Sequence, residues 1–186
     1  MPYFPMFVNI EKSLCVVVGG GKVALRKTKV LLDFNAIVTV VSPECSLEFE
    51  KLSRAYPLRI IRSPYKREFI KDAFIVIAAT DKREVNRRVL LHCREEGIHV
   101  NIADKREECS FYFPSIVRRE NLVIGISTSG RYPLLSKYLK EKINRIIPSK
   151  ISRVLAELEI TRGRKKIENI EREIKKLDEK LKKLEE

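Results

Sequence analysis

The sequence has no tryptophan and no glutamine, and it has only two histidines and four cysteines. Its cysteines are scattered and form no C-x-x-C pair, which argues against a zinc site and against a disulfide framework. No apolar run approaches the ~18 residues of a membrane span, and the N-terminus lacks a signal-peptide pattern. We therefore expect a cytoplasmic protein with free thiols and no membrane partner.

Acidic side chains are outnumbered by basic ones, 25 against 38, and the formal net charge is +13. The excess is concentrated in residues 114–150, which carry eight basic and two acidic side chains. Such a segment attracts anions, either nucleic acid or a polycarboxylate, although a solvated surface of a heat-adapted protein would give the same excess. No nucleic-acid recognition motif or aromatic stacking pattern is present, so we expect no nucleic-acid partner.

The most informative stretch is a short apolar, β-branched run, residues 14–18, which leads into three glycines and then into a helical pattern. Gly19, Gly21 and Ala24 fit G-x-G-x-x-G/A, in which a dinucleotide pyrophosphate rests on a helix N-terminus. The first glycine allows the tight turn, the second lets the backbone approach the phosphates, and the small Ala24 keeps helix and strand close. A tight structural turn in another α/β protein is the alternative. The expected phosphate-binding residues are Gly19, Gly20, Gly21, Lys22 and Val23.

Strands and helices alternate along the first part of the chain. Further strands are predicted at 36–41, 58–62, 74–81 and 98–104, with helices between them. The run at 74–81 is apolar as far as Ala79, as in the buried strands of parallel sheets, and it ends in the polar Thr80 and Asp81. The alternation indicates a doubly wound, Rossmann-like parallel sheet that binds ligands at the carboxyl ends of its strands.

Polar residues follow three of these strands. Ser42, Pro43 and Glu44 follow the second, where an acid usually holds the ribose of NAD, and we expect the adenosine there. The position of that acid holds Ser42, with Glu44 two residues later, which leaves NAD and NADP less clearly distinguished, although no arginine is present there to receive the 2′-phosphate of NADP. Thr80 and Asp81 end the strand where the nicotinamide would lie, although Asp81 is first of all expected to cap the following helix. Asp104 ends the fifth strand, predicted to be a central one.

The pattern changes after residue 113. A strand, a turn at Glu120 and Asn121, and a second strand are predicted, followed by a helix that starts near Pro133. The last 36 residues show a heptad seam of isoleucine and leucine, typical of a packed hairpin or a dimer element. We therefore expect an NAD-binding domain (1–113), a small α+β region for dimerisation and the substrate cleft (114–150), and a coiled-coil-like helical tail (151–186).

Five motifs together resemble one family, that of precorrin-2 dehydrogenase, the dehydrogenase and ferrochelatase part of siroheme synthase. They are residues 18–27, 78–81 with Asn86, 100–104, 110–115 and 127–133. The resemblance implies oxidation of precorrin-2 to sirohydrochlorin with NAD, and in many members insertion of ferrous iron to give siroheme. It also implies a homodimer whose middle region forms the interface. The sequence stops short of the methyltransferase domain that fused siroheme synthases carry, so we expect that activity to be absent, and we expect the heptad tail to stand in place of the family's usual helical end.

The resemblance strengthens particular residue assignments. Asp104 becomes the candidate catalytic base and the candidate group that steadies an incoming metal; a turn cap is the alternative. Ser127, Thr128 and Arg131 are candidates for binding the carboxylates of the tetrapyrrole, although the two hydroxyls could simply cap the next helix. A different class of function also fits the glycine turn, namely an NAD(H)-sensing binding module without catalysis.

Overall fold

The computed structural model describes residues 4–147, together with Lys175 and Glu179. The chain forms two compact units, Met1–Tyr112 and Phe113–Glu186. Apart from those two positions, the predicted heptad tail lies outside the described residues. The three-part organisation expected from the sequence therefore stays a prediction.

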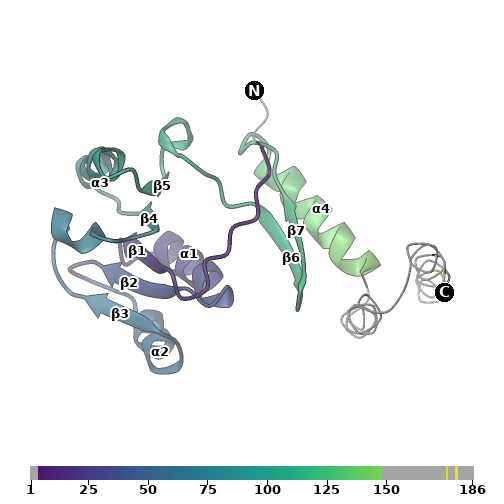
Figure 1. Cartoon of the computed structure of the whole chain (residues 1–186), viewed down its shortest axis with the longest axis horizontal. Helices are drawn as coiled ribbons and strands as arrows, with labels where there is room; N and C mark the ends of the chain where they lie inside the picture. Colours follow the sequence, from purple (N-terminus) through teal and green to yellow (C-terminus); the bar gives the residue numbers. More distant parts are fainter. Residues whose placement is uncertain (1–3, 148–174, 176–178, 180–186) are drawn as a thin grey trace, which may run out of the picture. The chain divides into compact units, whose positions relative to one another are not determined.

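The first unit is built around a five-stranded parallel sheet. Figure 1 shows α1 beside the sheet and α2 next to β3. Every residue from Cys15 to Val18 is buried, as expected for a strand covered on both faces. In chain order the elements are β1 (Leu14–Val18), α1 (Lys22–Asp33), β2 (Ile37–Val41), α2 (Leu47–Ala55), β3 (Leu58–Ile61), the 3-10 helix η1 (Arg67–Ile70), β4 (Ile75–Ala78), α3 (Arg83–Glu95), β5 (His99–Ile102) and the 3-10 helix η2 (Arg106–Glu108).

The strand order is β3-β2-β1-β4-β5. The chain leaves β1 toward β2 and β3 and later returns to the other side of β1 with β4 and β5. The order therefore reverses between β1 and β4, and the crevice at such a point is where doubly wound sheets bind their ligands. The predicted Rossmann-like fold is confirmed.

One face of the sheet packs against α3 and η1. Val16 and Val18 of β1 share a buried cluster with Val89 and Cys93 of α3 and Ile70 of η1. This apolar core fixes the first turns of α3 against the ends of β4 and β5. Polar groups carried by those turns are thereby held at the carboxyl side of the sheet.

The fourth and fifth strands are shorter than predicted. After β4 and β5 the ladder ends with Ala79 N–H donating to Val18 O (2.8 Å) and Ala103 N–H donating to Ala78 O (2.9 Å), and the chain then turns away. Phe74, predicted as the start of a fully buried strand, is 38% exposed. The prediction that Asp104 ends a central strand is wrong, because β5 is an edge strand and Asp104 lies beyond its last residue, Ile102.

The outer edge of β5 is occupied by side chains instead of a further strand. Val100 N–H donates to Ser110 Oγ (2.8 Å), and Ser110 N–H donates to Val100 O (2.9 Å). Ile102 N–H donates to Cys109 Sγ (3.2 Å). The segment after η2 thus satisfies the outward-facing backbone groups of this strand.

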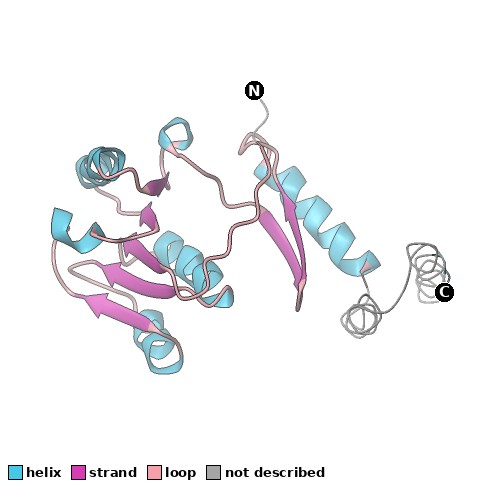
Figure 2. Cartoon of the chain, viewed as in Figure 1, coloured by secondary structure: helices cyan, strands magenta, loops and turns pink. Residues whose placement is uncertain are grey.

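The second unit contains an antiparallel pair, β6 (Ser115–Arg119) and β7 (Leu122–Ile126), and the helix α4 (Pro133–Ile146). The two strands form a sheet of their own, and Figure 2 shows them as a pair of neighbouring arrows. The predicted strand, turn and strand are confirmed, with Glu120 in the turn at φ 49°. Val117 and Ser136 are buried here, whereas Leu134 of α4 is 83% exposed. No helix in the described part of the chain is long and apolar enough to cross a membrane.

Candidate functional site

Gly19 is the first residue after β1, and its position requires glycine. Its φ is +128°, which side chains rarely tolerate, and a Cβ atom would lie 2.3 Å from the carbonyl oxygen of Ala79. The ends of β1 and β4 can therefore approach each other closely. This close approach lies at the point where the strand order reverses.

Gly20 packs against the loop that follows β2. A Cβ atom here would lie 1.9 Å from the Glu44 carbonyl oxygen, and Ser46 N–H donates to Gly20 O (3.3 Å). Sequence reasoning gave this middle glycine no packing role. The available signal was the run of three glycines, where the dinucleotide pattern leaves the middle position unspecified.

Gly21 differs from its two neighbours because it is open. It is the N-cap of α1 without a side-chain cap bond, and a Cβ atom would meet nothing within 4 Å. The first turn of α1, which begins with Lys22 and Val23, contains no acidic residue. Its backbone N–H groups and the positive helix end are thus available to an anion. These residues fit the pyrophosphate of a dinucleotide.

The predicted adenosine residues lie next to this turn. Ser42 is 8% exposed, and its hydroxyl donates to the carbonyl oxygen of Glu44 (2.6 Å). Pro43 and Glu44 are exposed. The Ser42 hydroxyl therefore stabilises its own loop, while Pro43 and Glu44 are exposed and accessible to a ligand. Their role toward adenosine stays a prediction.

Thr80, after β4, is tied to a buried amide on α3. Asn86 is 0% exposed, and its Oδ1 accepts hydrogen bonds from Thr80 N–H (3.2 Å) and from the Thr80 hydroxyl (2.7 Å). Its Nδ2 donates to Thr80 O (3.0 Å). Asp81 is exposed, and the prediction that it caps the next helix is wrong, because Lys82 is the N-cap of α3 and makes no side-chain cap bond. Its nearness to the cofactor stays a prediction.

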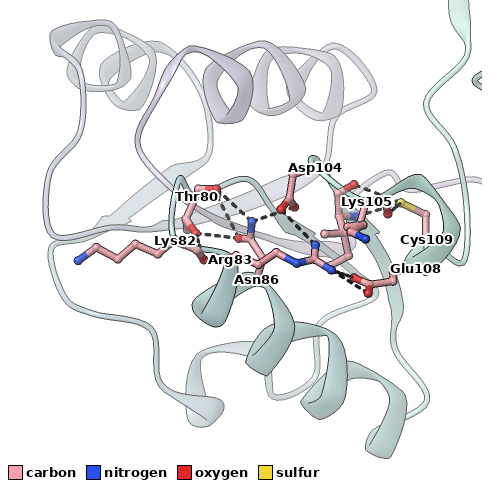
Figure 3. Close-up of polar contacts among 9 residues, drawn as sticks. Thr80, Lys82, Arg83, Asn86, Asp104, Lys105, Glu108 and Cys109 are labelled. Carbon is pink, nitrogen blue, oxygen red and sulfur yellow. Dashed lines mark hydrogen bonds and ion pairs between the residues drawn. The ribbon is translucent and has the colours of Figure 1, made fainter.

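Asp104 belongs to the same network, as Figure 3 shows. Its Oδ1 accepts a hydrogen bond from Asn86 Nδ2 (3.0 Å), and its Oδ2 lies 3.1 Å from Arg83 Nη1. The side chain remains 41% exposed, so a substrate can reach it. Arg83 in turn contacts both carboxylate oxygens of Glu108, at 2.8 and 2.9 Å. The structure therefore joins two predicted site residues, Thr80 and Asp104, through Asn86, which the sequence had indicated only as part of a family motif and without a role of its own.

Sequence reasoning missed Arg83 and Glu108 entirely, and it named Asn86 only within a family motif, without a role at the site. Asn86 had a detectable signal, because it lies on the apolar face of α3 together with Val89 and Cys93, where a polar side chain needs a specific partner. Arg83 and Glu108 had none, since charged residues are common throughout this chain. Their pairing depends on how α3 and η2 fold beside each other.

A second polar link connects α1 with β5. Lys27 Nζ donates to Asn101 Oδ1 (2.7 Å), and Asn101 Nδ2 donates to Phe111 O (2.9 Å). Burial, helped by the nearby charge of Arg26, lowers the pKa of Lys27 to about 8. This lysine therefore titrates close to neutral pH, which is unusual for its residue type.

The predicted substrate-binding residues lie in the second unit, in the loop before α4. Thr128 Oγ1 accepts a hydrogen bond from Tyr132 N–H (3.2 Å), and Ser127 Oγ accepts one from Ser129 N–H (3.1 Å). Both hydroxyls shape the loop, but neither accepts from an N–H group inside α4, whose N-cap is Tyr132 and has no side-chain cap bond, so the alternative of a helix cap is not supported. Arg131 is exposed. Their role toward a substrate stays a prediction.

All four cysteines are free thiols, as predicted: Cys15, Cys45, Cys93 and Cys109. Burial raises the pKa of Cys15 and of Cys93 to about 12, which makes both thiols unreactive near neutral pH. Among the residues that the structure describes, no group of three or more His, Cys, Asp or Glu side chains could hold a metal ion. The metal role of Asp104 stays a prediction.

Comparison with known proteins gives consistent matches to a family model, to curated proteins and to a solved structure. Residues 6–115 match the NAD_binding_7 family, described as "Putative NAD(P)-binding". The chain is 37% identical over 151 residues to a siroheme synthase of Photorhabdus laumondii, covering 81% of this chain and 32% of that protein. It is also 37% identical over 155 residues to a siroheme synthase of Nitrosomonas europaea, with 83% and 33% covered. The chain thus spans about a third of the length of these relatives.

A solved structure resembles the chain over nearly its whole length. SirC, a precorrin-2 dehydrogenase, matches with a TM-score of 0.75 and 27% identity, covering 95% of this chain and 88% of that one. The resemblance inferred from the sequence motifs is therefore confirmed. The chain belongs to the NAD_binding_7 family of NAD(P)-binding proteins and is a homologue of the siroheme synthases.

Proposed function

We propose that this protein oxidises precorrin-2 to sirohydrochlorin with NAD, a step of siroheme biosynthesis. The observation that carries the proposal is the joining of a glycine turn open to a phosphate and an accessible Asp104 within one unit, at the carboxyl side of one sheet. The likeness to SirC, a precorrin-2 dehydrogenase, over 88% of that chain supports it. Four free cysteines fit a reducing compartment such as the cytoplasm.

The chain's own residues would hold NAD in two places. The backbone from Gly19 to Val23 would bind the pyrophosphate, and Ser42, Pro43 and Glu44 would border the adenosine. Thr80 and Asp81 would lie near the nicotinamide. NAD, when bound, supplies the hydride acceptor, while the protein provides placement and charge.

Asp104 is the general base of the proposed reaction. Oxidation removes a hydride and a proton from the substrate, and a carboxylate oxygen of Asp104 accepts the proton. Because a carboxylate has about four acceptor positions, the bonds from Asn86 and Arg83 leave room for this proton. The same oxygens would take protons from the pyrrole nitrogens if the protein also inserts ferrous iron as a second substrate.

The substrate is a polycarboxylate, and the second unit is basic. Ser127, Thr128 and Arg131 would bind its carboxylates, with Arg131 supplying a full charge. An exposed arginine is suited to this task, since its guanidinium can pair with a carboxylate through two hydrogen bonds.

We also propose a homodimer, formed mainly through residues 114–150. The strands β6 and β7 pack against α4, and α4 leaves Leu134 (83%), Tyr138 (52%) and Ile146 (59%) exposed, which is apolar surface that a partner chain would cover. A chain truncated after Ser149 should keep the dimer mass in light scattering. A monomer mass for that chain would assign the association to the tail instead.

The proposed reaction is tested by mixing the purified protein with NAD and precorrin-2 without oxygen and following the absorption spectrum. The expected result is conversion to the sirohydrochlorin spectrum with matching formation of NADH, and no conversion without NAD. Binding of NAD without any turnover would overturn the proposal in favour of an NAD(H)-sensing module. Adding ferrous iron to the product mixture then tests for the spectrum of siroheme.

A further inference from the structure

The carboxylate of Asp104 is held from two sides by two different donors. Asn86 Nδ2 donates to Oδ1 at 3.0 Å, and Arg83 Nη1 lies 3.1 Å from Oδ2. Asn86 is buried and fixed by Thr80, so the first donor cannot move far. The orientation of the carboxylate about its own axis then depends on the second donor, Arg83 (Figure 3).

Arg83 is itself fixed by a second carboxylate. Its Nη2 lies 2.8 and 2.9 Å from the two oxygens of Glu108, whose side chain is only 29% exposed. Arg83 is the first residue of α3 and Glu108 is the last residue of η2. The planar guanidinium thus bridges two elements, and it cannot turn away from Asp104 without also breaking its contact with Glu108.

We propose that Arg83, anchored by Glu108, is a positioning residue for Asp104, an inference that rests on the proposed function. The guanidinium fixes the direction in which the remaining lone pairs of Asp104 point, and it compensates the charge that would repel a polycarboxylate substrate. A lysine at this position would keep the charge but would lack the planar fork that contacts both carboxylates. Substitutions of Arg83 can therefore separate its effect on the direction of the Asp104 lone pairs from the effect of its positive charge.

The decisive measurement is the steady-state kinetics of precorrin-2 oxidation by Arg83→Met. This change keeps most of the side-chain length and removes the hydrogen bonds to both Asp104 and Glu108, and we expect kcat to fall about fivefold, the loss typical of a partly exposed ion pair. Arg87→Met is the matched control, because Arg87 is an exposed arginine one turn further along α3. Its kcat should equal the parental value.

Arg83→Lys separates direction from charge. Because the ammonium keeps the positive charge, KM of Arg83→Lys should equal the parental value, while kcat should recover only in part relative to Arg83→Met. Full recovery of kcat would overturn the positioning role, since it would show that charge alone is sufficient. A purely structural role for Arg83 would instead lower the thermal midpoint without this split between KM and kcat.

The double variant tests whether Arg83 acts through Asp104. In the Asp104→Asn background, Arg83→Met should cause no further loss of kcat, and Glu108→Gln should have no effect once Arg83 is methionine. An undiminished loss in the Asp104→Asn background would overturn the inference, because Arg83 would then act on the substrate directly.

The failure of this inference can be told apart from the failure of the proposed function. If Asp104→Asn is impaired but Arg83→Met is not, this inference alone fails. If the parental protein does not oxidise precorrin-2, the proposed function fails and takes this inference with it.

Discussion

The two sides of the candidate site differ in the groups that they present, backbone groups after β1 and side chains after β4 and β5. The glycine turn after β1 presents backbone groups and almost no side chains, with Gly21 open to solvent. The region after β4 and β5 is instead a network of side chains, in which Thr80, Asn86 and Asp104 are joined by hydrogen bonds. One side can recognise an anion by shape and backbone N–H groups, whereas the other can exchange a proton.

This difference determines which substitutions each side tolerates. On the glycine side, a substitution does harm by adding atoms. The added atoms lower stability where the surrounding backbone leaves no room for them, and they lower ligand affinity where a ligand must approach the backbone. On the acid side the damage comes from changing a functional group while its shape stays the same. The following substitutions test this contrast in order of decreasing expected effect.

Replacing Asp104 by asparagine should have the largest effect. The amide keeps the shape but has no useful basicity, so we expect kcat for precorrin-2 oxidation to fall by about 10²–10⁴-fold. NAD titration should give the parental affinity, since the glycine side is unchanged. A parental rate would remove Asp104 as the base. Loss of iron insertion with intact oxidation would assign this residue to metal insertion alone.

Gly20→Ala should reduce stability more than function. The new Cβ atom would lie 1.9 Å from Glu44 O, so the loop after β2 must move, and we expect the free energy of unfolding to fall by about 1–3 kcal/mol. Urea denaturation monitored by circular dichroism gives this value. An unchanged midpoint would mean that this loop adapts without cost and that the glycine is not needed for packing.

Gly21→Val should show the opposite behaviour. A Cβ atom at this position meets nothing within 4 Å of the protein, so stability should change little. If a pyrophosphate approaches the backbone here, the added side chain blocks it, and NAD affinity should fall by about tenfold or more. Calorimetric titration with NAD measures this loss, with Gly20→Ala as the comparison for stability. Parental affinity would place the phosphates elsewhere.

Lys27 connects the two sides, and its effect should be the smallest and should depend on pH. Burial lowers its pKa from 10.5 to about 8 in the folded protein, so between these values the unfolded chain binds more protons and stability rises with pH. Relative to Lys27→Met, the parental protein should gain about 1 kcal/mol of unfolding free energy across this range, since water screens part of the charge. Denaturation of both proteins at pH 7.5 and pH 10 measures the gain. A constant difference would show that Lys27 keeps its ordinary pKa.

The fold was predictable because its signals are local. The five runs of β-branched residues and the glycine turn occupy the predicted places, and their alternation with helices specifies a parallel sheet. The position of Asp104 was less predictable. Whether β5 is central or at the edge depends on the strand order, and strand order is not encoded in any one segment.

The site was predictable only as far as its residues act through the backbone or carry a family motif. Asn86 left a trace in the sequence, because it interrupts the apolar face of α3. The contact between Arg83 and Glu108 left none, because it joins charged residues far apart in a chain that is a third charged. Only the folded structure shows which of the many arginines contacts Glu108 and Asp104.

The covering of β5 has a consequence for self-association. A free strand edge is a template on which another chain can add a strand, and many proteins protect such edges. Here the hydroxyl of Ser110 and the thiol of Cys109 receive the outward N–H groups of Val100 and Ile102. Alkylation of that thiol would remove the S–H group that donates to Ile102 O and would add bulk beside Ile102, which would displace this segment and expose the edge. A chain modified in this way should aggregate through its parallel sheet, because Cys109 normally protects the edge of β5 from pairing with a strand of another chain.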